Sequence, residues 1–237
     1  MRKKQELSFY HGSEGGGPDW NPPSEPLIRT ASDSTVYGIR LLAFYLKGAT
    51  RTQDNKDRFL ADLIQAKDVW NFPMFSVTPE TYSVGSDFGL PNCLDDVDIS
   101  GEYMTDLMIF RETHRRLHPV ERGVKTITIW YAPFTESLGA DVLGRAFESV
   151  GGYPFIFMSN AANNGFNNSL LAHEIGHILY FKQSGNIDAS DPTDPNGSIH
   201  SPQPDNVMFS TPDNNVNLEQ SQINKARNSF LFVEIDE

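Results

Sequence analysis

The sequence predicts an α/β protein in which a twisted, mixed β-sheet packs against helices. Residues 36–47 and 126–131 have the composition of sheet strands, and apolar residues recur at helical spacing from Phe59 to Asn71. The chain has 237 residues, of which 38% are hydrophobic, so it is long enough to bury a substantial core. We therefore expect one folded domain over residues 29–237.

The first 28 residues differ in composition from the rest of the chain. Glycine and proline are frequent in residues 15–18 and 21–23, which disfavours regular structure. Residues 1–28 are therefore predicted to form a flexible arm. Residues 1–4 carry three basic side chains, as a secretion signal does, but no apolar segment follows them. We expect a secreted protein, although its sequence contains no signal peptide.

Charge and composition exclude several classes of partner. The formal net charge is −12 and the isoelectric point is near 4.9, which argues against nucleic acid or an anionic membrane as a partner. No apolar stretch is long enough to span a bilayer. Cys93 is the single cysteine, so the chain cannot form an internal disulfide. We expect a monomer.

Strands and helices are predicted in order along the first half of the chain. The strand at 36–47 ends at Gly48, and Thr50 with Gln53 resembles a capping box for the helix that runs to Asn71. A second strand is predicted at 75–84, with a break at Pro79. Residues 85–100 are acidic and predicted to form a loop on a solvated face.

The middle of the chain continues the pattern. Apolar residues at helical spacing predict a helix from Tyr103 to Leu117, in which His114 is interpreted as a structural or exposed residue. Two strands follow, at 126–131 and 153–159. Pro154 predicts an edge position for the second strand, because proline lacks the backbone N–H that an internal strand uses. An extended peptide could pair with such an edge.

Residues 173–177 spell H-E-x-x-H within an apolar run, after a potential helix cap at 167–169. Residues four apart lie on one face of a helix, so His173 and His177 can bind the same cation. Glu174 beside them can hydrogen-bond a water molecule at that cation. Zn²⁺ fits best, because imidazole suits it and a catalytic zinc site keeps one position open for water.

The alternative interpretation of this motif is a buried helix that carries two surface histidines. It is disfavoured because a glutamate and two histidines interrupt an apolar helix at an energetic cost unless they have a function. A zinc ion lowers the pKa of its bound water to roughly 7, and the Glu174 carboxylate is then the candidate general base.

A catalytic zinc site needs a third protein ligand, and His200 is the preferred candidate. The helix is expected to continue to Gly185, and the polar loop at 186–206 then leads back toward the metal. Fully extended, the residues between Gly185 and His200 could span roughly 45 Å, far more than the return requires. The alternatives are carboxylates: Glu219, Asp188, Asp191, Asp194 and Asp205. The same acidic loop could bind Ca²⁺, but its Asp-x₂-Asp-x₂-Asp spacing does not match an EF-hand.

A last helix is predicted near the C-terminus. Asn217 with Gln220 can form its cap, and the core face is expected to carry the apolar residues Leu218, Ile223, Ala226 and Phe230.

These motifs together resemble the metzincin clan of zinc endopeptidases, whose pattern is H-E-x-x-H-x-x-G-x-x-H followed by a methionine turn. The resemblance implies that His173, His177 and His200 bind zinc, that Glu174 is the general base, and that Met208 forms the turn beneath the metal. It covers roughly residues 30–233, but its specific motifs occupy only 173–177 and 200–208.

The sequence departs from the clan's pattern at three places. Tyr180 stands at the glycine position and Gln183 at the position of the third histidine, so the third ligand must come from further along the chain. Phe209 follows Met208, so a tyrosine that stabilises the oxyanion must come from elsewhere. Cys93 is faintly similar to the clan's inhibitory cysteine, but a buried structural thiol is the preferred interpretation.

The predicted function is therefore zinc-dependent hydrolysis of peptide bonds in a protein or peptide substrate. Two alternatives use the same residues. One is a zinc hydrolase of a non-protein amide such as peptidoglycan. The other is a zinc-stabilised binding or effector module without catalytic activity, which would need four protein ligands and no base.

Overall fold

A computed structural model of the chain describes residues 36–53, 56–70, 80–117, 125–134, 143–150, 153–162, 169–181, 189–211, 215–229, 231 and 233–235. The predicted arm at 1–28 lies outside these residues. Most of the helices and strands predicted from the sequence fall within them.

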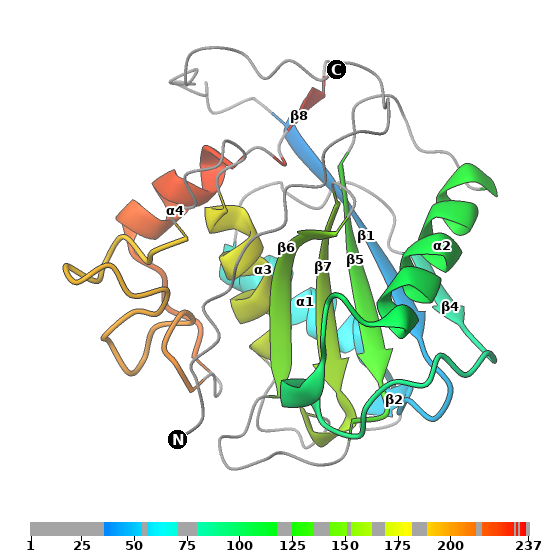
Figure 1. The fold of residues 1–237 in the computed structure, drawn as a ribbon. Helices are drawn as coiled ribbons and strands as arrows, with labels where there is room; N and C mark the ends of the chain where they lie inside the picture. Colours follow the sequence, from blue (N-terminus) through cyan, green and yellow to red (C-terminus); the bar gives the residue numbers. More distant parts are fainter. Residues whose placement is uncertain are drawn as a thin grey trace.

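A mixed sheet forms the centre of the fold (Figure 1). Its main path is, in order, β4 (Glu80–Ser83), β1 (Val36–Tyr45), β5 (Lys125–Ala132), β7 (Tyr153–Ser159) and β6 (Gly144–Val150). Neighbouring strands are parallel except for β6, which is antiparallel to β7. A short strand, β8 (Val233–Ile235), pairs antiparallel with the start of β1. The predicted mixed sheet is confirmed.

Helices cover both faces of this sheet (Figure 1). One face packs against α2 (Glu102–Leu117), which follows the short 3₁₀ turn η1 (Leu94–Asp96). The other face packs against α1 (Arg58–Trp70) and α3 (Leu170–Tyr180), and α4 (Gln220–Arg227) packs on α3 from outside. A second 3₁₀ turn, η2 (Asn160–Ala162), follows β7.

The long apolar run of β1 is explained by burial on both of its faces. Leu41, Ala43 and Tyr45 contribute to the core beneath α1 and α3, whereas the alternate residues Leu42 and Phe44 contribute to the core beneath α2. Successive side chains of a strand point to opposite faces, so a strand that is covered on both sides carries few polar residues.

The predicted position of one strand in the sheet is wrong. Residues 153–159 were expected at the edge, but β7 lies between β5 and β6, and β6 is the edge strand. The proline that suggested an edge lies where the pairing of β6 with β7 is irregular, between Phe147 and Val150 on β6. A bulge of this kind tolerates a residue without an N–H group.

The predicted start of the first helix is also wrong. Thr50 and Gln53 do not form a capping box, because β2 (Thr52–Gln53) instead pairs with β3 (Lys56–Asp57) and α1 begins only at Arg58. The first N–H groups of α1 find other acceptors. The N–H of Phe59 donates to the Tyr45 hydroxyl at 2.8 Å.

Two further boundaries differ from the prediction. The helix that carries H-E-x-x-H was expected to reach Gly185, but α3 ends at Tyr180 and Phe181 is extended, with ψ of 137°. The last helix was expected to be capped by Asn217 and Gln220. Its capping box is instead formed by Glu219 and Gln222. The strand predicted at 75–84 is described only from Glu80 onward, as β4.

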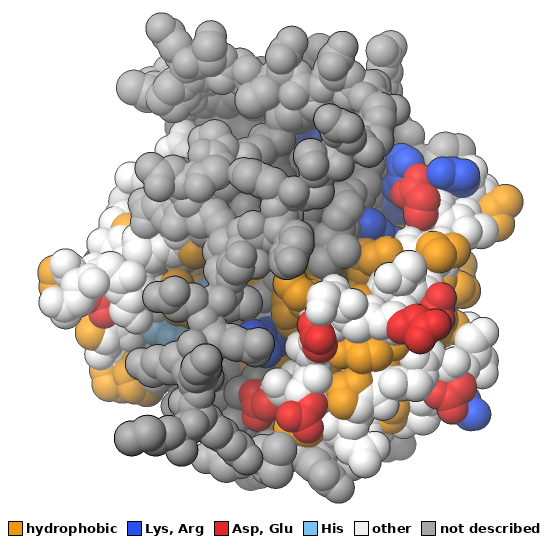
Figure 2. Space-filling model, viewed as in Figure 1, with side chains coloured by type: hydrophobic (Ala, Val, Ile, Leu, Met, Phe, Trp, Pro, Cys, Tyr) orange, Lys and Arg blue, Asp and Glu red, His pale blue; other side chains and the backbone are white. Residues whose placement is uncertain are grey.

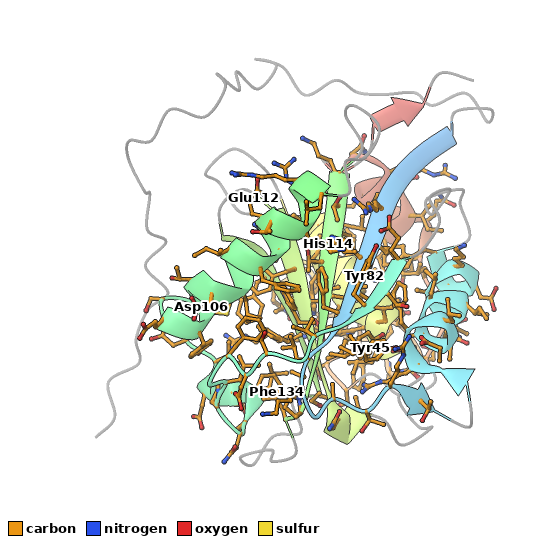
Figure 3. All side chains as sticks on the ribbon, turned by 90° about the vertical axis from the view of Figure 1, so that its right-hand side faces the viewer. Tyr45, Tyr82, Asp106, Glu112, His114 and Phe134 are labelled. Carbon is orange, nitrogen blue, oxygen red and sulfur yellow. The ribbon has the colours of Figure 1, made fainter. Side chains whose placement is uncertain are left out.

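The interpretation of His114 as a structural residue agrees with its surroundings. His114 projects from α2 toward the sheet, where its ring centre lies 4.1 Å from that of Tyr82 (Figure 3). A second aromatic ring, that of Phe44, lies 5.2 Å away.

Among the described residues, no helix is both long and apolar enough to cross a membrane.

Candidate metal centre

Helix α3 supplies two histidines to one face. Every residue of α3 is buried, because its apolar residues pack between the sheet, α1 and α4. The four-residue spacing directs the rings of His173 and His177 to the same side, where their Nε2 atoms are 3.0 Å apart. The two rings stand edge to face, with centres 4.6 Å apart.

A third histidine reaches the same point from the loop that follows α3. The ring of His200 is stacked on that of His173 at 5.4 Å and lies 5.0 Å from that of His177. One ring nitrogen of each of the three histidines lies within 4.8 Å of the others. The structure therefore brings the three predicted ligands together, and they could hold a metal ion.

The ring of His173 is oriented by a backbone carbonyl. Its Nδ1 lies 2.7 Å from the carbonyl oxygen of Val207, which can only accept a hydrogen bond. Nδ1 is therefore the protonated nitrogen, and the lone pair of Nε2 faces the other two histidines. A hydrogen bond from the second ring nitrogen is the usual support of a histidine that binds a metal.

The burial of the centre favours neutral imidazoles. The pKa of His173 is lowered to about 4, chiefly by burial and in smaller part by the nearby His200, whereas the hydrogen bond to Val207 opposes this shift. Burial also lowers the pKa of His177 well below its ordinary value, and that of His200 is lowered for the same reason. Neutral rings have the free lone pairs that a cation needs.

Glu174 lies against the edge strand of the sheet. Its side chain is buried, and burial raises the pKa of its carboxyl group to about 8. The backbone N–H of Ala146 and the charge of Arg145, both on β6, oppose that shift. A Cβ atom on Gly144 would lie 3.0 Å from Cγ and Oε1 of Glu174, so the glycine makes room for the carboxyl group.

The turn at Asn206–Phe209 lies directly against α3. The N–H of Phe209 donates to the carbonyl of Asn206 at 3.0 Å, and Met208 is fully buried. A Cβ atom on Gly176 would lie 2.3 Å from Sδ of Met208. A methionine at this turn and a glycine in the helix therefore fit one another closely, and the turn brings the Val207 carbonyl to His173.

The carboxylates considered as alternative ligands have other partners. Asp191 accepts hydrogen bonds from Thr193 and Gln222, Asp194 accepts from the N–H of Asn196, and Asp205 accepts from Asn217. Glu219 caps α4. Asp188 lies outside the described residues. Within the part of the chain that the structure describes, the three histidines are the one group of potential metal ligands.

No protein-family model matches the chain, and no curated protein matches it. The chemical interpretation of the centre therefore depends on its own residues. Histidine surface is visible on the side of the molecule that carries α3 and α4 (Figure 2). Of the three histidines, His200 is partly exposed, whereas His173 and His177 are buried.

Strand β6 contributes to this centre, although it was not predicted from the sequence. Gly144 and Ala146 contact Glu174. A signal was present in Gly151-Gly152, which separates two strand-forming runs by two residues, as in a hairpin. Gly176 lies within the motif itself, but only the position of Met208 reveals why a glycine is needed there.

Proposed function

We propose that this chain is a zinc-dependent endopeptidase of the metzincin type. One observation carries the proposal: three neutral imidazoles converge on a single point, and a buried carboxyl group stands on the same helix as two of them. The order of the elements supports it as well. An antiparallel edge strand, the histidine helix, a methionine turn against that helix and a final helix follow one another along the chain.

The donor set fits zinc. Three imidazole nitrogens suit Zn²⁺, and three protein ligands leave one position open, as in catalytic zinc sites. When bound, zinc would polarise the scissile carbonyl and lower the pKa of a water molecule to about 7. The centre has no thiolate ligand, which would favour a softer metal, because the one cysteine, Cys93, is buried elsewhere, at the start of η1.

Glu174 is the general base in this proposal. It takes the proton of the attacking water and passes it to the leaving amine. The residue must be ionised for this role, and the N–H of Ala146 and the charge of Arg145 both favour the ionised carboxylate. A cation held by the three histidines would favour it further, because a nearby positive charge lowers the pKa of a carboxyl group.

The edge strand β6 is the proposed contact for the substrate backbone. Among the described residues its one neighbour in the sheet is β7, and Glu174 lies against its residues Gly144 and Ala146. An extended peptide that pairs with the outer side of β6 would run beside the histidines. The geometry therefore favours an unfolded segment of a protein or a peptide as the substrate.

Metal analysis combined with a protease assay tests the proposal. The purified protein is expected to contain one zinc ion, to cleave casein and to lose this activity with a chelator. Glu174→Ala is expected to retain zinc and to abolish turnover, because the base is removed and the ligands are not. Full activity of Glu174→Ala would refute the assignment of the base.

The same assay separates the two alternatives. Cleavage of cell-wall fragments without cleavage of casein would identify a hydrolase of a non-protein amide. Bound zinc without turnover of either substrate would favour a binding module. The second outcome is disfavoured because Glu174, a buried carboxyl group beside the histidines, has no task in such a module.

A further inference from the structure

Gln222, on α4, is a fully buried amide whose hydrogen-bonding positions are all in use. Its Nε2 donates to Oδ2 of Asp191 at 2.7 Å and to Oδ1 of Asn206 at 3.0 Å. Its Oε1 accepts from Nδ2 of Asn206 at 2.9 Å and from the N–H of Glu219 at 2.8 Å. Side chains that are both buried and fully bonded in this way determine one arrangement of the segments they join.

The first of these bonds leads to His200. Asp191 is buried, and its backbone N–H donates to the carbonyl of Ser198 at 2.6 Å. The hydroxyl of Ser198 in turn accepts from the N–H of His200 at 3.0 Å. A chain of hydrogen bonds therefore runs from Gln222 to Asp191, from Asp191 to Ser198, and from Ser198 to the backbone of His200.

Asp191 also supports the chain segment that follows His200. Its Oδ1 accepts from the N–H and the hydroxyl of Thr193, at 2.8 and 2.5 Å. The Thr193 hydroxyl lies 2.9 Å from that of Ser201, whose N–H donates to the carbonyl of Met208. Both chain segments that flank His200 are thus tied to Asp191, the first through its backbone N–H and the second through its carboxylate.

The second bond of Gln222 leads to His173. Asn206 is buried, and its Oδ1 also accepts from the N–H of Met208 at 2.9 Å, which stabilises the turn. This turn carries the Val207 carbonyl that orients the ring of His173. One side chain of α4 therefore supports both the loop that supplies a ligand and the turn that orients another ligand.

We propose that Gln222 is a positioning residue of the metal centre, which it holds together through Asp191 and Asn206 without touching any of the histidines. The loop at 189–211 has no helix or long strand of its own. Besides the backbone hydrogen bonds of its turns, its conformation depends on side-chain hydrogen bonds, and three buried ones join the loop to the Gln222 amide. The inference rests on the metal-binding part of the proposed function.

The test replaces Gln222 with methionine, which has a similar length and shape but no hydrogen-bonding amide. Asp191 and Asn206 then each lose a buried partner, and His200 is no longer held against the other two histidines. Zinc affinity, measured by competition with a chromophoric chelator on the full chain, is expected to fall by about tenfold or more, as it does for other outer-shell partners of zinc ligands.

A second measurement distinguishes positioning from general stability. With Co²⁺ in place of zinc, the unaltered protein is expected to show the visible absorption of a tetrahedral site, and Gln222→Met is expected to lose intensity as one histidine leaves. Thr193→Val is a milder change in a half-buried residue. It removes only the hydroxyl bonds toward Asp191 and Ser201, and we expect a smaller loss of affinity.

Tyr131→Phe is the matched control. It also removes one buried hydrogen bond, from the Tyr131 hydroxyl to Asp62 at 2.7 Å, but on strand β5 beneath α1. It is expected to lower the melting temperature and to leave zinc affinity and the Co²⁺ spectrum unchanged. Equal losses of affinity in Tyr131→Phe and in the other two variants would overturn the proposal.

The outcomes separate this inference from the proposed function. If the unaltered protein binds neither zinc nor Co²⁺, the metal centre itself is refuted, and the role of Gln222 with it. If the unaltered protein binds both ions and the folded Gln222→Met and Thr193→Val variants bind them equally well, only the positioning role is refuted. If Gln222→Met does not fold, Thr193→Val decides in the same way.

Discussion

A Cβ atom on Gly176 would lie 2.3 Å from Sδ of Met208, closer than side chains approach in folded proteins. Cζ2 of Trp70 would be 2.9 Å away on another side, and the indole N–H of Trp70 donates to the carbonyl of Ala172 in the same helix. The glycine of the motif thus allows two large side chains, those of Met208 and Trp70, to pack directly against α3.

Gly176→Ala is therefore expected to lower the free energy of unfolding. The added methyl group must displace Met208 or Trp70, and overpacking of a core costs about 1–3 kcal/mol. Urea denaturation of the two proteins measures the difference. Gly85→Ala is the control, because a Cβ atom there has no neighbour within 4 Å. Equal stability of Gly176→Ala and the unaltered protein would show that Met208 packs elsewhere.

His200→Ala is expected to weaken zinc binding by more than roughly 100-fold, the upper range for loss of a residue that only supports a ligand, because the proposed third ligand itself is removed. Asp205→Ala serves as the comparison. Asp205 was considered from the sequence as an alternative third ligand, but it is exposed, and its carboxylate accepts a hydrogen bond from Asn217. Its replacement is expected to leave zinc affinity unchanged. The opposite result, with loss of binding only in Asp205→Ala, would reassign the third ligand.

Gly144→Ala tests how the edge strand positions Glu174, the proposed base. The new Cβ atom would lie 3.0 Å from Oε1 of Glu174, so the carboxyl group must shift by a few tenths of an ångström. Small displacements of a catalytic group reduce rates strongly, and we expect turnover of casein to fall by about tenfold. Zinc content should stay the same, since no histidine is displaced. Unchanged turnover would indicate that β6 does not constrain the base.

The metal-free protein is expected to lose stability as the pH rises toward 8, through Glu174. Burial raises the pKa of its carboxyl group from an ordinary 4.5 to about 8, so the folded state binds a proton that the unfolded state has released. This contribution is fully present below pH 4.5 and is lost as the pH rises through 8. Glu174→Gln does not titrate. Its stability relative to the unaltered protein should therefore increase from pH 5 to pH 8, as measured by urea denaturation with a chelator present.

The same comparison with zinc present provides the control. A bound cation favours the ionised carboxylate, so the pH dependence of the difference should weaken or disappear. The prediction fails if, without metal, the free energies of unfolding of Glu174→Gln and the unaltered protein differ by the same amount at every pH. Glu174 would then be ionised in the folded protein throughout this pH range.

The strands and helices that the sequence predicted correctly are those with a clear local periodicity. The alternation at 126–131 gave β5, and the apolar spacing at 103–117 gave α2 within a residue at either end. The errors concern relations between segments. Pro154 suggested an edge, but whether a strand is internal depends on which partners it finds, and a bulge removed the conflict with its proline.

The end of α3 illustrates the same limit. Gly185 is a typical helix stop, so the sequence predicted a helix that continues to that residue. Tyr180 is buried, with its ring facing that of Trp70 at 6.3 Å and the ammonium group of Lys225 at 5.2 Å. The last residue of the helix therefore packs against α1 and α4, and no local propensity encodes these neighbours.

By itself, the sequence determined that His173, Glu174 and His177 share one helix and that the two histidines face the same way. The period of a helix decides this without any other part of the chain. Only the tertiary structure decided that His200 completes the group, that β6 holds Glu174 and that Gln222 supports the loop. Those relations join segments far apart in the sequence, and their geometry arises only when sheet, helices and loop are packed together.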